Sequence, residues 1–262
     1  MTQSTYNGKV WFIGAGPGDP ELITLKGHRL IAGADLVLYA GSLVPPQIVA
    51  CAGEKAKVVD SSPLNLEETH ALIRECAATG GLIARVHTGD PSLYGALREQ
   101  IALLERDGIA YAVVPGVSAA FAAAAAATVS LTVPESVQSF AITRLPGRTP
   151  VPETQSVRSL AEHGGSLAVY LSGAEATRLP GELRKANLPE DTPILAAYRV
   201  GWPEEKLHWS KLADLDDLIA RENWIGQVVF LVLPGGRKDE AGQAAAKSKL
   251  YDATFSHGFR QV

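Results

Sequence analysis

The sequence predicts an α/β protein built from two α/β domains, and three observations point to this fold. The chain has 262 residues, which is long for a single domain. In its first half, short runs rich in Val, Ile and Leu alternate with segments of helical periodicity, a pattern typical of βαβ units and a parallel sheet. An apolar fraction of 46% with 20% charged residues is that of an ordinary globular enzyme.

Five strands are expected in the first half, each nearly continuously apolar, as a sheet covered on both faces requires. They are Val10–Ile13, Leu36–Tyr39, Lys57–Val59, Leu82–His87 and Tyr111–Val114.

One helix of the first half is well marked, over Leu66–Thr79. Asn65 can cap its start, and Gly80 and Gly81 end it. We expect its buried stripe to consist of Leu66, Leu72, Ile73 and Cys76. An alanine-rich helix over Ser118–Ala127 then follows the fifth strand.

The second half predicts a less regular α/β unit with a mixed sheet. Its expected strands are Phe140–Thr143, Leu167–Leu171, Ile194–Tyr198, Lys206–Trp209 and Val228–Leu233. The third of these is followed directly by the fourth, which favours a hairpin and therefore an antiparallel pair. We expect an N-terminal domain over residues 1–116, a C-terminal domain over 117–235 and a C-terminal tail over 236–262.

Composition and charge argue against several classes of protein. The net charge is −4 with both signs scattered, so no basic stripe indicates nucleic acid as a partner. Cys51 and Cys76 form no CxxC pair and no cluster at metal-ligand spacing, so no metal is expected. Residues 1–9 lack the apolar core of a signal peptide, and the longest apolar run, Ala119–Ala127, is too short to span a membrane. The cytoplasm is the expected compartment.

A glycine-rich turn, Gly14–Asp19, follows the first strand, where open parallel sheets bind their ligands. A dinucleotide fingerprint needs a third glycine where Asp19 stands, and no Gly-Lys-Ser/Thr follows to make a P-loop. A turn that holds another small ligand and a tight turn without a ligand both remain open.

Two further polar turns follow the fourth and fifth strands. His87–Ser92 places Gly89 and Asp90 at the same edge of the predicted sheet as Gly14–Asp19, which suggests a shared crevice. Asp90 can also act as a helix cap. Pro115–Ala119 places Ser118 where it either caps the next helix or contacts the same ligand.

These three turns, in this order and spacing, resemble the tetrapyrrole methylase family over almost the whole chain. Leu38–Val44, Leu131–Gln138 and the closing Leu250–Arg260 resemble one corrin-pathway member of that family. The resemblance implies two α/β domains facing a cleft, a homodimer, and S-adenosylmethionine bound in the cleft and converted to S-adenosylhomocysteine. It further implies methylation of a tetrapyrrole in cobalamin biosynthesis.

The family's pattern implies a set of cofactor-binding residues in this chain. They are Pro17, Thr88, Gly89, Asp90, Leu93, Ser118, Ala119, Leu171, Ala197 and Tyr198. A polycarboxylate substrate needs cationic or hydrogen-bonding partners, for which His87, Arg144 and Arg148 are candidates. A core histidine and a solvated loop are the alternatives. Trp202 is expected either to line the cleft or to serve as hydrophobic cover.

No catalytic residue is assigned. An enamine carbon of a reduced tetrapyrrole is itself nucleophilic, so orientation is the main contribution expected of the protein. The rival interpretations are another corrin-pathway methylase that acts at a different ring carbon, a nicotinamide-dependent oxidoreductase, and a non-catalytic protein that keeps the fold and still binds S-adenosylmethionine. Fluorescence titration with NADH separates the oxidoreductase from the others.

Overall fold

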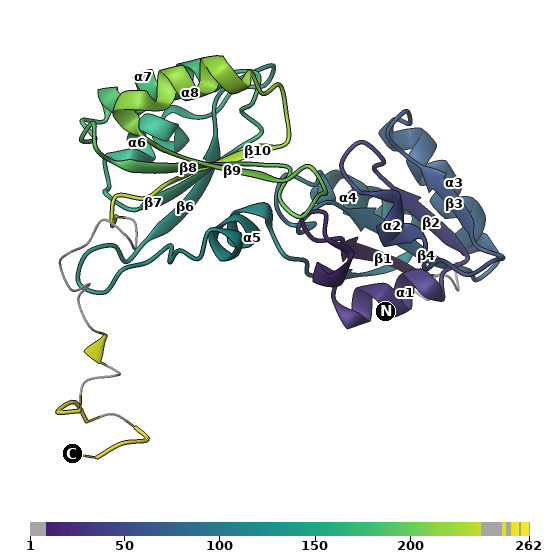
Figure 1. Ribbon diagram of the computed structural model, residues 1–262. Coiled ribbons are helices and arrows are strands. Elements are labelled where there is room, and N and C mark those ends of the chain that lie inside the picture. The colour runs from purple at the N-terminus through teal and green to yellow at the C-terminus, as the bar shows by residue number, and fades with distance from the viewer. Residues whose placement is uncertain (1–8, 237–247, 250–252, 257, 262) are drawn as a thin grey trace. The chain divides into compact units, whose positions relative to one another are not determined.

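The structure, a computed structural model, describes residues 9–236, 248–249, 253–256 and 258–261 (Figure 1). The chain divides into two compact units. The first unit ends at Ala122 and also includes Arg199–Pro203; the second runs from Ala123 to Tyr198 and resumes at Glu204. Leu250–Asp252 and His257, which belong to the closing segment singled out in the sequence, lie outside the described residues.

The first unit contains a parallel sheet of five strands in the order β3-β2-β4-β1-β5. Its strands are β1 (Lys9–Gly14), β2 (Leu36–Tyr39), β3 (Lys57–Asp60), β4 (Leu82–His87) and β5 (Ala110–Val114). Its helices are α1 (Leu25–Ala32), α2 (Pro46–Val49), α3 (Leu66–Ala78) and α4 (Leu97–Asp107), with a short 3-10 helix at Pro20–Leu22. Helix α5 (Ala119–Ala126) crosses the division between the units.

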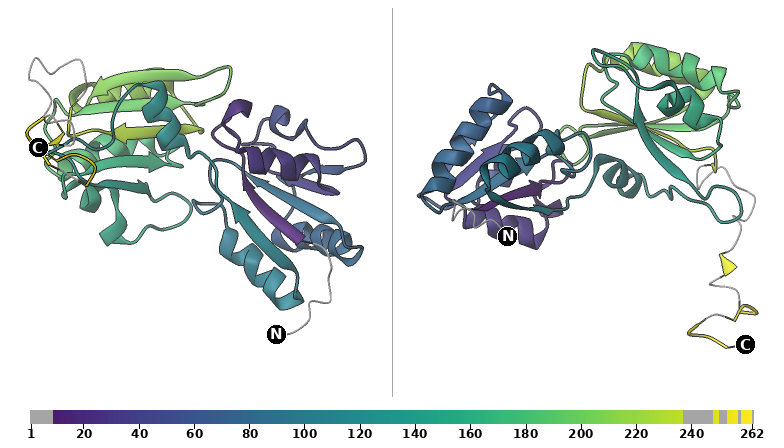
Figure 2. Two further views of the ribbon diagram at one scale, coloured as in Figure 1. Left: turned by 90° about the horizontal axis from the view of Figure 1, so that it is seen from below. Right: turned by 180° about the vertical axis from the view of Figure 1, so that it is seen from behind.

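Helices cover both faces of this sheet (Figure 2). On one face, Ile31 of α1 and Ile48 of α2 pack with Ile13 of β1. On the other, Ile73 of α3 and Leu104 of α4 pack against the opposite side of the strands. This double cover explains the nearly continuous apolar runs of the central strands β1, β2 and β4 and confirms the predicted parallel α/β layer. The edge strands β3 and β5 are more exposed than the sequence analysis expects.

Helix α3 begins as the sequence predicts, and its buried face includes residues that the sequence did not indicate. Asn65 accepts a hydrogen bond from the backbone N–H of Glu68, whose side chain accepts one from the backbone N–H of Asn65, which completes a capping box. Besides Ile73, the fully buried residues of the helix are Thr69, His70 and Ala77. Leu72 and Cys76 are partly buried and pack against the same core, as expected, whereas Leu66 is partly exposed and is not part of that core.

His70 can be buried because α4 supplies a carboxylate. Its Nε2 lies 2.7 Å from Oδ2 of Asp107, and the two side chains are 7% and 13% exposed. Hydrogen bonds from Arg106 and His70 hold the pKa of Asp107 below its usual value. Arg74 of α3 also reaches this carboxylate, so Asp107 ties α3 to α4.

We expect Asp107→Asn to lower the free energy of unfolding by about 1–2 kcal/mol at pH 7, because it removes a charged acceptor from a buried pair. A carboxylate with a lowered pKa stabilises the fold above its unfolded pKa, about 4, and this stabilisation is lost as the pH falls further. Thermal unfolding at pH 7 and pH 3 checks this. A difference between parent and variant that persists undiminished at pH 3 contradicts the assignment.

The second unit contains a mixed sheet of five strands in the order β6-β7-β10-β8-β9. They are β6 (Phe140–Arg144), β7 (Ser166–Tyr170), β8 (Pro193–Tyr198), β9 (Lys206–Lys211) and β10 (Val228–Val232). Helices α6 (Val157–Ala161), α7 (Leu179–Lys185) and α8 (Leu215–Glu222) contribute to a core that includes Leu183, Leu215 and Phe230. Strands β8 and β9 pair antiparallel, which confirms the predicted hairpin and mixed sheet.

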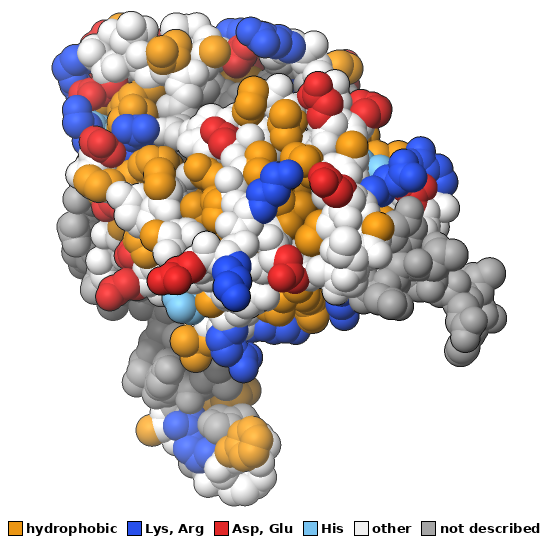
Figure 3. All heavy atoms as spheres, turned by 90° about the vertical axis from the view of Figure 1, so that its right-hand side faces the viewer, with side chains coloured by type: hydrophobic (Ala, Val, Ile, Leu, Met, Phe, Trp, Pro, Cys, Tyr) orange, Lys and Arg blue, Asp and Glu red, His pale blue; other side chains and the backbone are white. Residues whose placement is uncertain are grey.

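The charged side chains in view in Figure 3 are mixed in sign, with acidic and basic groups interspersed among apolar patches. Within the part of the chain that the structure describes, no helix is long and apolar enough to cross a membrane, and no three His, Cys, Asp or Glu side chains are grouped as a metal site.

Candidate functional site

Three loops meet at one edge of the first sheet, where β4, β1 and β5 end side by side. Strand β1 pairs with β4 on one side and with β5 on the other. The turns after β1 and β4 are hydrogen-bonded to each other: Gly16 N donates to Gly89 O at 3.2 Å, and Gly89 N donates to Gly16 O at 2.7 Å. We call this edge, with the turns Gly14–Asp19, Thr88–Asp90 and Pro115–Ala119, the carboxyl edge.

Glycines allow the three backbones of the carboxyl edge to touch. A Cβ on Gly116 would lie 2.1 Å from Gly89 O and 2.7 Å from Gly14 Cα, and a Cβ on Gly14 would lie 2.5 Å from Gly116 Cα. Gly89 differs, because its φ is +59° and its nearest atom, Ser118 Cα, would be 3.8 Å from an added Cβ. Gly14 and Gly116 therefore serve backbone packing, while Gly89 serves the left-handed turn, where an added Cβ would be in ordinary van der Waals contact with Ser118.

Asp90 ties the second turn to the third. Its Oδ2 accepts a hydrogen bond from Gly116 N at 2.9 Å, and its Oδ1 accepts one from Ser92 N at 2.8 Å and one from the Ser92 hydroxyl. Burial acts to raise the pKa of Asp90, but these hydrogen bonds outweigh it and the pKa is lowered. Asp90 is therefore an ionised brace that orders the edge, and it does not act as the cap of α4, which begins after Ala96.

Asp19 stands where a dinucleotide fingerprint has its third glycine, and it starts a separate short helix. Its side chain accepts a hydrogen bond from Glu21 N at 2.8 Å and caps the 3-10 helix Pro20–Leu22. The regular helix after β1, α1, begins only at Leu25 and is capped by Thr24. The glycine turn therefore does not run directly into a helix start as it does in a dinucleotide fold, which disfavours the nicotinamide alternative.

Trp202 fixes the first turn from a distant part of the sequence. Arg199–Pro203 connects β8 to β9 but is grouped with the first unit. Trp202 Nε1 donates to Pro17 O at 3.1 Å, and a Cβ on Gly18 would lie 2.3 Å from Trp202 Cδ1. The Arg199 guanidinium lies 4.8 Å from the centre of the Trp202 ring. The sequence left Trp202 as a cleft wall or hydrophobic cover, and it is a clamp on the Pro17–Gly18 backbone.

His87 lies beneath the carboxyl edge. Its side chain is 7% exposed beside Phe12, with ring centroids 5.9 Å apart, and among the described residues Nε2 has no hydrogen-bond partner. Burial, with a smaller effect of Arg85, lowers the pKa of His87 to about 3. At neutral pH this ring is uncharged, so it offers a substrate carboxylate a hydrogen bond at most, without a positive charge.

Arg144 and Arg148 differ in their hydrogen bonding. Arg144, at the end of β6, donates to the backbone oxygens of Leu145, Thr149 and Pro150 at 3.3, 3.2 and 2.8 Å. Arg148, in the same loop, is exposed, and no hydrogen bond or ion pair engages it within the described ranges. Arg144 therefore shapes the loop that presents Arg148.

The candidate residues of the second unit gather at one end of its sheet. Strand β10 lies between β7 and β8 and is antiparallel to both, so Leu171, just after β7, and Tyr198, at the end of β8, lie at the same edge of the sheet. Leu171 has a φ of +50° and is 61% exposed, an unusual position for a leucine. Ala197 is fully buried, and the Tyr198 ring stacks on Trp224 at 6.3 Å. The exposed Leu171 is an apolar surface available to a flat ligand.

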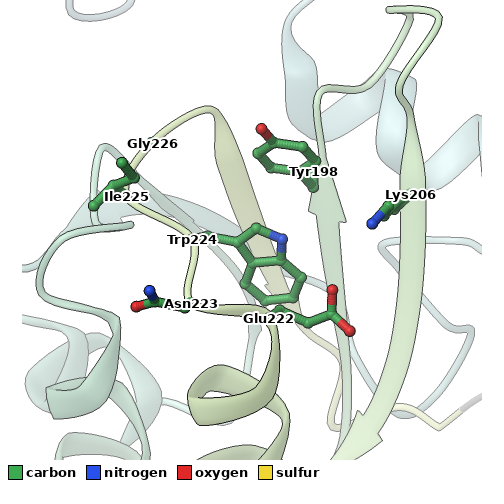
Figure 4. A pocket seen from close by; sticks show the side chains of 7 residues that line it. All are labelled: Tyr198, Lys206, Glu222, Asn223, Trp224, Ile225 and Gly226. Carbon is green, nitrogen blue, oxygen red and sulfur yellow. The ribbon is translucent and has the colours of Figure 1, made fainter.

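A pocket of about 220 Å³ opens beside Tyr198 (Figure 4). It is lined by Tyr198, Lys206, Glu222, Asn223, Trp224, Ile225 and Gly226. Its wall adjoins the segment after β7, because a Cβ on Gly173 would lie 2.8 Å from Gly226 N. Both aromatic and charged groups are thus available near Leu171.

Comparison with known proteins identifies relatives of this chain. The family model of Tetrapyrrole (Corrin/Porphyrin) Methylases matches residues 9–216. A cobalt-precorrin-4 C(11)-methyltransferase of Priestia megaterium is 42% identical over 253 residues, which cover 97% of this chain and 98% of the relative. A precorrin-4 C(11)-methyltransferase of Pseudomonas aeruginosa is 41% identical over 255 residues, covering 96% and 98%.

Solved structures resemble the chain as well. The X-ray structure of a cobalamin biosynthetic enzyme, cobalt precorrin-4 methyltransferase, superposes with a TM-score of 0.84 at 40% identity and covers 88% of this chain and 97% of its own. A uroporphyrin-III C-methyl transferase from Thermus thermophilus, complexed with S-adenyl homocysteine, gives a TM-score of 0.70 at 26% identity, covering 86% and 92%.

Proposed function

The chain belongs to the tetrapyrrole methylase family, and on that premise we propose that it is an S-adenosylmethionine-dependent methyltransferase that methylates precorrin-4 at C-11 to give precorrin-5 in cobalamin biosynthesis. The corrin-pathway member suggested by the sequence segments is the precorrin-4 C(11)-methyltransferase. Relatives named for cobalt-precorrin-4 and relatives named for precorrin-4 both support the proposal. The proposed substrate is therefore the precorrin-4 macrocycle, either with or without cobalt.

The carboxyl edge of the first sheet is the observation that carries the proposal. It presents bare backbone at Gly89 beside Ser118 and a clamped Pro17 carbonyl. These features fit a ligand with an amino acid end and hydroxyl groups, such as S-adenosylmethionine. The residues of the first unit proposed to bind S-adenosylmethionine are Pro17, Thr88, Gly89, Asp90, Leu93, Ser118 and Ala119. Those of the second unit are Leu171, Ala197 and Tyr198.

When bound, S-adenosylmethionine supplies an electrophilic methyl group on a sulfonium sulfur. The substrate supplies the nucleophilic ring carbon, so the chain needs no strong nucleophile of its own. Its contribution is orientation of the two reactants, which is worth roughly 7–11 kcal/mol when both are held at near-attack geometry. The braced backbone of the carboxyl edge provides the rigidity that this requires.

The carboxylates of the substrate are proposed to meet His87, Arg144 and Arg148. Arg148 is the strongest of the three, because it is exposed and is not already engaged within the described residues. Arg144 acts through the loop that it orders. The neutral His87 ring contributes a hydrogen bond only.

Two finer features rest on the family resemblance alone. We propose that the chain works as a homodimer and that it acts in the cytoplasm. Neither feature is needed for the site residues named above.

Titration calorimetry with S-adenosylhomocysteine tests the proposal, with NADH as the rival ligand. We expect saturable binding of S-adenosylhomocysteine and no binding of NADH. Incubation with S-adenosylmethionine and precorrin-4, with and without cobalt, should then yield S-adenosylhomocysteine and a product one methyl group heavier. Binding without product in both forms of the substrate contradicts the enzyme and favours a non-catalytic protein that keeps the fold.

A further inference from the structure

Arg85 is a largely buried cation whose partners are all neutral. It projects from β4 toward α4, where its Nε donates to Gln100 Oε1 at 2.9 Å and its Nη1 donates to Ser61 Oγ at 2.7 Å. Burial lowers the pKa of Arg85 to about 10. No carboxylate forms an ion pair with it within the described residues, although buried charges usually have such a partner. The neutral partners therefore call for an explanation.

Gln100 connects Arg85 to the loop before α4 through hydrogen bonds. The side chain is 7% exposed, and its Nε2 donates to Ala96 O at 3.1 Å and to Gly95 O at 3.3 Å. The guanidinium can only donate and the two carbonyls can only accept, so the orientation of the amide is fixed. A glutamine fits this place because it accepts on one side and donates on the other.

The loop held by Gln100 is strained. Tyr94 and Ala96 have φ values of +54° and +47°, which cost free energy for residues with a Cβ. Between them, a Cβ on Gly95 would lie 2.5 Å from Pro91 O. Such a strained bend persists only where neighbouring groups hold it in place. Here the Gln100 amide holds it by donating to its last two backbone carbonyls.

The strained loop begins at the carboxyl edge. It follows Asp90 directly and carries Leu93, whose backbone N donates to Asp90 O at 3.2 Å. At the far end of the network, the Ser61 hydroxyl donates to Tyr39 O at 3.1 Å. The ends of β2 and β3 are thereby connected through Arg85 to the loop that carries Leu93.

We propose that Gln100, oriented by Arg85, is a positioning residue for the cofactor site: it fixes the Tyr94–Ala96 bend and thereby places Leu93 and the turn of Asp90. The inference rests on the proposed function for its ligand. The neutral partner of Arg85 is required because a carboxylate at position 100 would satisfy the guanidinium but could not donate to the bend.

The test compares Gln100→Leu and Gln100→Glu with Asp107→Asn, a control at the other end of the same helix. Both Gln100 variants should raise the dissociation constant of S-adenosylhomocysteine by about tenfold or more, since small misplacements of binding groups have effects of this size. Asp107→Asn should lower the melting temperature about as much as the Gln100 variants do, but its dissociation constant for S-adenosylhomocysteine should stay within about twofold of the parent's. When Ala96→Gly is added to Gln100→Leu, the affinity for S-adenosylhomocysteine should rise again by about threefold, because glycine adopts the bend without strain.

Hydrogen exchange provides a readout that is independent of the ligand. In the ligand-free protein, amides of residues 92–97 should exchange faster in both Gln100 variants than in the parent and in Asp107→Asn. Parent-like binding and exchange in Gln100→Glu would overturn the inference, as would an affinity loss in Asp107→Asn equal to that in Gln100→Leu. If the parent itself fails to bind S-adenosylhomocysteine, the proposed function is wrong, and the exchange rates still decide whether Gln100 fixes the bend.

Discussion

Replacement of Gly116 by alanine is expected to abolish binding of S-adenosylhomocysteine and to lower the free energy of unfolding by about 3 kcal/mol. The new Cβ would lie 2.1 Å from Gly89 O and 2.7 Å from Gly14 Cα, so it meets backbone on two sides. Neither neighbour can rotate away as a side chain would. The turns after β1 and β4 must therefore separate from the turn after β5, which also breaks the bond from Gly116 N to Asp90.

Gly181→Ala is the matched control for this substitution. Gly181 lies in α7, and an added Cβ would meet no atom within 4 Å. It should leave ligand affinity unchanged and stabilise the protein by up to about 1 kcal/mol, because alanine favours helix over glycine. Calorimetry and thermal unfolding of both variants give the comparison. Parent-like affinity in Gly116→Ala would show that the close packing of the three turns is unimportant for the ligand.

Loss of the Trp202 clamp should have the second largest effect. Trp202→Ala removes both the donor to Pro17 O and the ring that lies against Gly18, so the first turn loses both of these contacts with Trp202. We expect the dissociation constant of S-adenosylhomocysteine to rise by about tenfold to a hundredfold. Titration calorimetry measures this directly.

Trp202→Phe separates the two contributions of the clamp. It keeps an aromatic ring over Gly18 but has no N–H for Pro17 O, so about a threefold to tenfold loss of affinity is expected, intermediate between parent and Trp202→Ala. Trp209→Phe, the same change in β9, should bind like the parent. Equal affinities for the parent and Trp202→Ala would mean that the clamp does not place Pro17.

The strands and helix α3 could be predicted because their sequence signals are local. Apolar runs mark strands that are covered on both faces, and Asn65 with Glu68 marks the start of α3. The burial of His70 in α3 was not predicted, because histidine is a polar residue. Its burial depends on Asp107, 37 positions away in the sequence, and no periodicity reveals such a partner.

The arrangement of the three turns was predictable from local signals as well. Glycines and polar residues after β1, β4 and β5 indicated the carboxyl edge, because parallel strands end together. Trp202 was not assigned as a clamp, since it contacts Pro17 across 185 positions of sequence. Gln100 gave no signal, because a single glutamine in an amphipathic helix is ordinarily solvated. The glycines at positions 18 and 201 were the local signal: an added Cβ at Gly18 would meet the Trp202 ring, and one at Gly201 would meet the backbone of Asp19.

The most direct test is transfer of a labelled methyl group from S-adenosylmethionine carrying carbon-13 in that group to precorrin-4, with the product examined by carbon NMR. We expect a single new labelled resonance, from a methyl group bonded to C-11 of the macrocycle, and its loss in Gly116→Ala. A label on any other ring carbon, or no transfer to either the cobalt-free or the cobalt-containing substrate, would contradict the proposed function.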